Sequence, residues 1–203
     1  MSGAHQPRTR VSLRGPAAIV VECLLPSVLL RVREPGTGLA LWRRPTRVGL
    51  HRAVGALLAT DRFCLTAEGD PGAASRALMR DLPVAGRTLE QDVAFLARLF
   101  ATVTQAASVR LRLEHVSDNA CRRHHVDAVR LRLLCTYAGP GTEWVDAAGE
   151  RRRMPRFQVG IFKGSAYPEA APRVLHRSPP VEHLPPRRRS RLLLCIDELE
   201  APR

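Results

Sequence analysis

Apolar and polar residues alternate strictly over the stretch that begins at Val109. Val109, Leu111 and Leu113 alternate with Arg110 and Arg112. Since successive side chains of a β-strand point to opposite faces of a sheet, this pattern predicts a half-buried antiparallel strand. Three later segments are further strand candidates, at residues 157–162, 173–176 and 191–196. We therefore expect residues 109–197 to form a β-rich core.

The N-terminal half has a different period. Apolar residues recur at three and four positions between Leu89 and Ala106, and Thr88 and Gln91 have the spacing of a capping box, which predicts a helix. Shorter helices are expected at 48–60 and 71–80, beside strands near 39–42 and 63–65. The fold class is therefore α+β. We expect one domain over residues 16–203, with a mainly helical part at 16–108, preceded by a flexible tail at 1–15.

The chain is strongly basic, with 32 basic and 19 acidic residues and a formal net charge of +13. Such a charge is typical of proteins that bind nucleic acids or anionic membranes. However, Lys163 is the only lysine, and a bias toward arginine is what a GC-rich coding sequence produces. No helix-turn-helix or zinc-finger spacing accompanies the charge, and aromatic residues make up only 4% of the chain. We therefore do not expect specific nucleic-acid binding.

The cysteines and the apolar N-terminal stretch indicate in which cellular compartment the protein is expected. Five cysteines are scattered without any Cys-x-x-Cys pair, which argues against a disulfide framework. The stretch from Ala17 to Val32 is apolar and follows basic residues, but Glu22 and Pro26 interrupt it. We expect a cytoplasmic protein without a membrane partner.

One His-x-Asp triplet occurs in the chain, at His125 and Asp127. Residues i and i+2 of a strand share a face, so these two side chains could bind one metal ion together, with His176 as a third ligand from a later strand. Two histidines and one carboxylate form the facial triad of non-haem Fe(II) oxygenases, which leaves coordination positions open. If the strand phase holds from His125 to Tyr137, the ligands share a face with the apolar interior.

Two other interpretations remain open. Cys121, His124 and His125, completed by Cys135 or His176, could bind Zn²⁺ in a closed tetrahedral site. On a strand, however, adjacent side chains point to opposite faces, so His124 and His125 would point apart. Alternatively, the three candidate ligands bind no metal, and His125 and His176 are ordinary hydrogen-bonded histidines.

The order of these elements resembles that of the Fe(II)- and 2-oxoglutarate-dependent dioxygenases, over about residues 109–197. In that family a His-x-Asp motif precedes a distal histidine and then a basic residue. The resemblance implies a double-stranded β-helix, or jelly-roll-like, core, with Fe(II) at the triad. It also implies that Arg191, in the following strand, binds the far carboxylate of 2-oxoglutarate. Arg191 comes later after His176 than the family pattern has it, so three other basic residues are alternative partners for this carboxylate: Arg187, Arg189 and Lys163.

Several short segments resemble a bacterial family named for its domain of unknown function 1826. They include Arg-His-His-Val-Asp at 123–127, Phe-Lys-Gly at 162–164 and Leu-His-Arg-Ser-Pro-Pro at 175–180. This second resemblance implies no activity.

Together with the resemblance to the dioxygenases, the His-Asp-His pattern predicts an iron- and 2-oxoglutarate-dependent oxygenase-like protein with an unknown substrate. The alternative is a zinc-binding or metal-handling protein without catalytic turnover.

Overall fold

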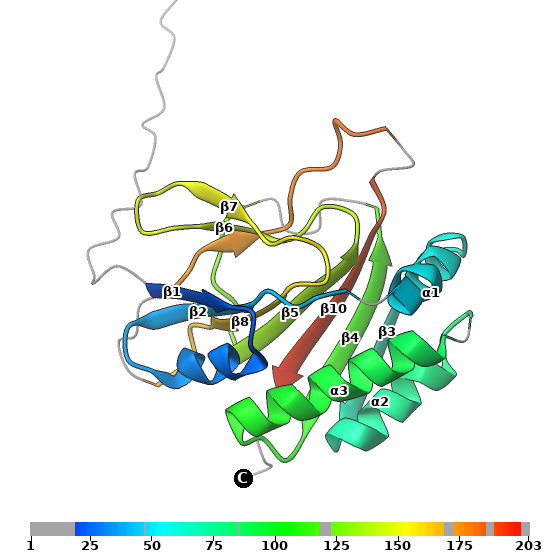
Figure 1. Ribbon diagram of the computed structural model, residues 1–203, viewed down its shortest axis with the longest axis horizontal. Helices are drawn as coiled ribbons and strands as arrows, with labels where there is room; N and C mark the ends of the chain where they lie inside the picture. Colours follow the sequence, from blue (N-terminus) through cyan, green and yellow to red (C-terminus); the bar gives the residue numbers. More distant parts are fainter. Residues whose placement is uncertain are drawn as a thin grey trace, which may run out of the picture.

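The structure is a computed structural model that describes residues 19–46, 48–84, 86–117, 123–168, 173–185 and 189–199. Two sheets form its framework (Figure 1). The large sheet has the strand order β1-β2-β8-β5-β10-β4-β3, and the small sheet has the order β7-β6-β9. All neighbouring strands are antiparallel except β1 and β2.

The strands of the large sheet are β1 (Ile19–Cys23), β2 (Thr37–Trp42), β3 (Phe63–Gly69), β4 (Val109–Val116), β5 (Leu131–Ala138), β8 (Val159–Lys163) and β10 (Arg191–Glu198). Those of the small sheet are β6 (Glu143–Val145), β7 (Arg151–Arg153) and β9 (His176–Arg177). The helices are α1 (Val48–Leu58), α2 (Pro71–Arg80), α3 (Arg87–Thr104) and the 3-10 helix η1 (Pro26–Arg33).

The main hydrophobic core lies between the helices and one face of the large sheet. The apolar stripe of α3, including Leu96 and Phe100, is fully buried there, against strand residues such as Leu111, Leu133 and Ile196. Figure 1 shows α2 and α3 running side by side on this face, with α1 beside them. This layer covers one face of the large sheet, and the residues of that face alternate along each strand with those of the opposite face.

A second, smaller core lies on the opposite face, which the small sheet covers. It contains Leu134, Trp144, Phe162 and Cys195, contributed by both sheets. Strand alternation thus divides β5 between the two cores, with Leu133 facing the helices and Leu134 facing the small sheet. We call the side of the large sheet that faces the small sheet its inner face.

The predicted helices are present, with α2 at the predicted bounds of 71–80. The predicted capping box of the long helix is wrong. The helix α3 begins at Arg87, its N-cap residue is Gly86, and no side chain caps it. The part before β4 also supplies β1, β2 and β3 to the large sheet. Helices and strands are therefore interleaved in this part of the chain, and β2 pairs directly with β8 of the C-terminal half.

The predicted phase of the strand after His125 is wrong. The chain bends at residues 128–130, and β5 begins only at Leu131. The alternation therefore does not carry through from the His-x-Asp triplet. The odd-numbered residues of β5, such as Leu133 and Cys135, face the helices, whereas Arg132 belongs to the inner face.

The apolar stretch between Ala17 and Val32 forms β1 and most of η1 over its described part. Among the described residues, no helix is long and apolar enough to cross a membrane. Three predictions concern residues outside the described ranges: the tail at 1–15, Cys121 as a zinc ligand and Arg187 as an anion ligand.

Candidate metal centre

The backbones of His125 and His176 are paired. The two residues form an isolated antiparallel bridge, in which the amide of His125 donates to the carbonyl of His176 at 2.9 Å and the reverse bond measures 3.0 Å. His176 also lies opposite Trp144 of β6, whose side chain belongs to the inner core. The bridge thus places both histidines side by side, on the side of the small sheet that faces the large sheet.

The loop after His125 is held in place by the segment that follows β8. The amide of Ser165 donates to the carbonyl of Asp127 at 2.8 Å, and the amide of Gly164 donates to that of Arg130 at 2.8 Å. A Cβ atom on Gly164 would lie only 1.9 Å from the carbonyl oxygen of Val129. Glycine at position 164 therefore allows the close approach that fixes the backbone of Asp127.

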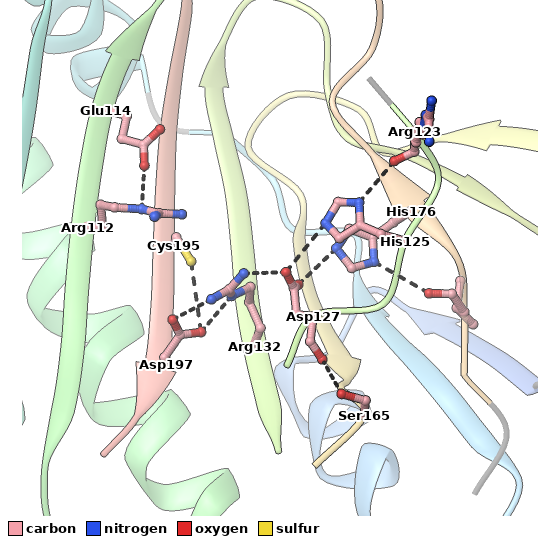
Figure 2. Close-up of polar contacts among 11 residues, drawn as sticks. Arg112, Glu114, Arg123, His125, Asp127, Arg132, Ser165, His176, Cys195 and Asp197 are labelled. Atoms are coloured by element: carbon pink, nitrogen blue, oxygen red, sulfur yellow. Dashed lines mark hydrogen bonds and ion pairs between the residues drawn. The ribbon is translucent and has the colours of Figure 1, made fainter. Parts of the chain in front are cut away.

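The side chains of His125, Asp127 and His176 converge (Figure 2). One ligand atom from each lies within 4.8 Å of the others. Nε2 of His176 is 2.9 Å from Oδ2 of Asp127, and Nε2 of His125 is 3.5 Å from Oδ1. Ligands at right angles around a metal at about 2.1 Å are about 3 Å apart, so these spacings suit neighbouring positions on one ion.

Both imidazoles are oriented by their other nitrogen. Nδ1 of His125 lies 3.1 Å from the carbonyl oxygen of Arg123, and Nδ1 of His176 lies 3.4 Å from that of Val174. A carbonyl oxygen can only accept a hydrogen bond, so each Nδ1 carries the proton when the ring is neutral. Each Nε2 is then left with its lone pair directed at the cluster, which is the usual arrangement of metal-binding histidines.

The surroundings of the cluster keep Asp127 ionised. Burial of the carboxyl group opposes its ionisation, but the nearby imidazole of His176 and the charge of Arg132 outweigh this effect and lower its pKa. Oδ2 of Asp127 is buried and has no hydrogen bond of good geometry within the described part of the chain. His176 is buried against the ring of Phe162, at 4.5 Å between ring centroids. An ionised carboxylate with an unsatisfied buried oxygen beside two imidazole lone pairs fits a divalent cation.

Arg132 and Asp197 also belong to the site, although sequence reasoning did not identify them. Arg132 donates from Nη1 to Oδ1 of Asp127, and from Nε and Nη2 to the two oxygens of Asp197 at 2.6 Å each. The two residues lie directly opposite each other on β5 and β10. The sequence gives a signal for Arg132 alone, which is the one charged residue in the otherwise apolar strand β5, whereas Asp197 follows only from the register between the two strands.

The structure describes three of the four predicted cationic residues, Arg191, Arg189 and Lys163, and places them differently. Arg191 is buried at the start of β10, where it donates to the carbonyl of Pro140 at 2.8 Å and to Oγ of Ser178 at 2.9 Å. By strand alternation it belongs to the inner face, with Cys195. Arg189 donates to the carbonyl of Leu184.

Lys163 points away from the cluster of His125, Asp127 and His176. It follows Phe162 of the inner core, so its side chain lies on the helical face of β8. Its ammonium group donates to the carbonyl of Glu34 at 2.9 Å and lies 4.6 Å from the centroid of the Tyr167 ring. Lys163 is therefore not a candidate ligand for an anion bound at this site.

The closed zinc site is not assembled by the described residues. Cys135 is buried on the helical face of the large sheet beside Arg44, so the sheet separates it from the cluster. Burial raises the pKa of its thiol to about 12, which disfavours the thiolate that zinc requires. His124 neighbours Arg177 and Glu143, which are paired on the outer side of the small sheet. Of the described residues that this alternative needs, only His125 and His176 meet.

The fold is similar to that of solved oxygenases. A Pseudomonas putida prolyl-4-hydroxylase superposes with a TM-score of 0.53 at 14% identity, over 87% of this chain and 99% of that one. A full-length Neurospora crassa protein, solved in complex with alpha-KG and 5-formyluracil, superposes with a TM-score of 0.53 at 10% identity, over 95% and 87%. At these identities the likeness concerns the sheet-rich α+β fold, with its large antiparallel sheet, which is similar to the jelly-roll folds of 2-oxoglutarate oxygenases.

Sequence comparison adds the family. No curated protein has a significantly similar sequence. The family model described as "Protein of unknown function (DUF1826)" matches residues 25–197. This match covers most of the chain, including all three residues of the His-Asp-His cluster, and the chain therefore belongs to the DUF1826 family.

Proposed function

We propose that this protein is an Fe(II)- and 2-oxoglutarate-dependent oxygenase that acts on a substrate still to be identified. One observation carries the proposal: the free Nε2 atoms of His125 and His176 and the carboxylate of Asp127 converge, while both Nδ1 atoms are held by backbone carbonyls. Two histidines and one carboxylate are the ligand set that leaves half of an octahedral iron site open.

The similar solved structures support this assignment. The Neurospora crassa protein was solved in complex with alpha-KG, which is 2-oxoglutarate, and its fold resembles that of this chain. We infer that the two sheets here are the two halves of a double-stranded β-helix, or jelly-roll-like, core, with α1, α2 and α3 packed on its outside. In this arrangement residues 109–197 supply the metal-binding core, and the part before residue 109 supports it.

Each residue of the cluster has a separate task in this proposal. His125, Asp127 and His176 would hold Fe(II), which supplies the oxidising chemistry with O₂. The bridge between the two histidine backbones keeps the imidazoles at a fixed spacing. Phe162, which packs on His176, excludes water from one side of the cluster.

Arg191 is the proposed partner of the far carboxylate of 2-oxoglutarate. It is buried on the inner face, and its contact with Ser178 ties it to the segment that carries His176, two residues earlier. Its guanidinium can form a bidentate, charge-assisted pair with a carboxylate. Lys163 faces the helices, and Arg189 is bonded to the loop before β10, so Arg191 is the best placed of the three described candidates.

The proposal is tested by succinate formation from 2-oxoglutarate in air by the iron-loaded protein. Slow, substrate-independent turnover is expected for the wild type and none for Asp127→Ala. Arg191→Ala should weaken 2-oxoglutarate binding about thirtyfold, the effect of losing about 2 kcal/mol, without changing the iron content. Arg189→Ala is the matched control and should resemble the wild type. Iron-loaded wild type that forms no succinate would contradict the proposed turnover.

The high positive charge has no assigned role in this function. We propose that any binding to duplex DNA is weak, independent of sequence and steeply reduced by salt, because counterion release alone would drive it. Nanomolar, sequence-selective binding at physiological ionic strength would show that the +13 charge serves a nucleic-acid partner instead.

A further inference from the structure

Arg132 lies between two carboxylates and donates a hydrogen bond to only one of the two oxygens of Asp127. Its Nη1 donates to Oδ1 of Asp127, which also lies 3.5 Å from Nε2 of His125, whereas Oδ2 lies 2.9 Å from Nε2 of His176. On its other side the guanidinium is held by Asp197 through two parallel bonds of 2.6 Å. Figure 2 shows the guanidinium between the two acids, with both imidazoles on the far side of Asp127.

The pair formed by Arg132 and Asp197 is built into the large sheet. The residues lie opposite each other on β5 and β10, which are adjacent central strands of this sheet. Their side chains are only 17% and 11% exposed, so solvent competes little for their bonds. A bidentate pair fixes the plane of the guanidinium, and this plane determines where the remaining nitrogen points. A lysine, with a single nitrogen, could not bond both acids with this geometry.

We propose that Arg132, held by Asp197, is a positioning residue that restricts Asp127 to binding the metal through Oδ2 alone. This inference rests on the proposed function, because it concerns the same metal centre. A carboxylate oxygen that accepts a charge-assisted hydrogen bond has less electron density to give to a cation. Oδ1 is therefore committed to Arg132, and Oδ2, which is buried and has no hydrogen bond of good geometry within the described segments, is left for the metal.

The consequence concerns how many positions remain open at the metal. A carboxylate can bind a cation with one oxygen or with both. If Asp127 bound with both, it would occupy a fourth position beside those of His125 and His176. A ligand that chelates through two atoms, as 2-oxoglutarate would, needs two adjacent open positions in addition to the one for O₂. Keeping Asp127 to one oxygen therefore keeps the site open to both ligands.

Charge balance points the same way. Asp127 and Asp197 both contact the Arg132 guanidinium. Removal of this one cation would therefore leave two neighbouring, largely buried carboxylates without a counter-charge. Two such carboxylates attract a divalent cation more strongly than one does. Loss of Arg132 is therefore expected to preserve or tighten binding of a bare metal ion while it impairs binding of a chelating anion.

The experiment uses Co(II) in place of Fe(II), because the visible absorption of bound Co(II) changes with its coordination number and does not depend on turnover. Four proteins are compared: the wild type, Arg132→Gln, Arg132→Lys and the control Arg130→Gln. Arg130 lies two residues from Arg132 and pairs with Glu198 at 3.1 Å, but its side chain is 40% exposed. Each protein is titrated with Co(II) and then, as the Co(II) form, with 2-oxoglutarate.

Both Arg132 variants should bind one Co(II) per chain with an affinity no lower than that of the wild type, but with a changed visible spectrum. Their affinity for 2-oxoglutarate should fall about tenfold or more. Arg130→Gln should match the wild type in all three measurements. A purely structural role of Arg132 would lower thermal stability without changing the Co(II) spectrum of the folded fraction.

Folded Arg132 variants with a wild-type spectrum and wild-type affinity for 2-oxoglutarate would overturn the inference and leave the proposed function intact. If Arg132→Gln does not fold, Asp197→Asn makes the same test, because it removes the anchor that aims Arg132. An unchanged spectrum in that variant also overturns the inference. By contrast, an Asp127→Ala variant that binds Co(II) as well as the wild type does would contradict the proposed metal centre itself.

Discussion

His125 and His176 exchange two backbone hydrogen bonds, of 2.9 and 3.0 Å, although they lie 51 positions apart in the chain (176 minus 125). The bridge places their rings 4.7 Å apart, with both Nε2 atoms facing Asp127. Because the pairing involves the backbone, the spacing of the two imidazoles depends on the small sheet and not on the bound ligand. A metal site built in this way is largely formed before the metal arrives.

The first prediction concerns the ligand set. Alanine at His125, Asp127 or His176 should each abolish stoichiometric binding of Fe(II) or Co(II), because a facial site has no spare protein ligand. His124→Ala is the matched control, since His124 neighbours Arg177 and Glu143 on the outer side of the small sheet. Metal content and calorimetric titration measure the effect. A protein that needs His124 but tolerates the loss of Asp127 would favour the closed zinc site.

A second prediction concerns the pH dependence of folding in the metal-free protein. The folded-state pKa of Asp127 is lowered, so its contribution to stability is present above the unfolded-state pKa, which is about 3.9 for an aspartate. This contribution is lost as the pH falls through the lower pKa of the folded state. Wild type should therefore be more stable than Asp127→Asn at neutral pH, and the difference should shrink in acid. Urea unfolding at several pH values tests this, and a difference that does not vary with pH would contradict it.

A third prediction concerns the close approach at Gly164. Gly164→Ala should cost about 3 kcal/mol or more and weaken metal binding, because its Cβ would lie 1.9 Å from the carbonyl oxygen of Val129 and 2.8 Å from that of Asp127. Gly55→Ala in α1 is the control. A Cβ there meets no atom within 4 Å, so helix propensity should stabilise the protein by about 0.5–1 kcal/mol. Equal effects of the two substitutions in thermal unfolding would argue against the close approach.

A fourth prediction concerns the layer that supports the site. Arg44 is buried and donates to Asp92 of α3 at 2.6 and 2.8 Å, and Tyr137 of β5 donates to the same carboxylate at 2.7 Å. Arg44→Gln should cost about 3 kcal/mol, because it leaves a partly buried carboxylate without its cation. The neighbouring Arg43→Gln breaks only an exposed pair with Glu22 and should cost less than about 1 kcal/mol. Chemical denaturation distinguishes the two, and a similar cost for both would contradict the prediction.

Several strands and the candidate ligands could be predicted because their signals are local. A two-residue spacing brought His125 and Asp127 together, and a short apolar segment carried His176. The alternation in Val109–Val116 and the helical period of α3 likewise reflect neighbours in the sequence. Such periodicities depend only on which face of an element is buried.

The remaining features depend on contacts between distant residues. The bond from Arg132 to Asp197 joins residues 65 positions apart, and it follows from the register between β5 and β10. The bend at residues 128–130 took His125 and Asp127 off the face of the odd-numbered β5 residues, which do face the main core, because Gly164 and Ser165 hold that loop from another part of the chain. Lys163 lies on the helical face for a similar reason, since the strand phase of β8 is set by its pairing with β2 and β5.

The central claim is that His125, Asp127 and His176 hold a metal ion with open positions beside it. It is tested most directly by anaerobic calorimetry, in which protein fully loaded with Fe(II) is titrated with 2-oxoglutarate. We expect one molecule to bind per chain, only when iron is present, and no binding by Asp127→Ala. A wild-type protein that holds one equivalent of iron and binds no 2-oxoglutarate would contradict the claim.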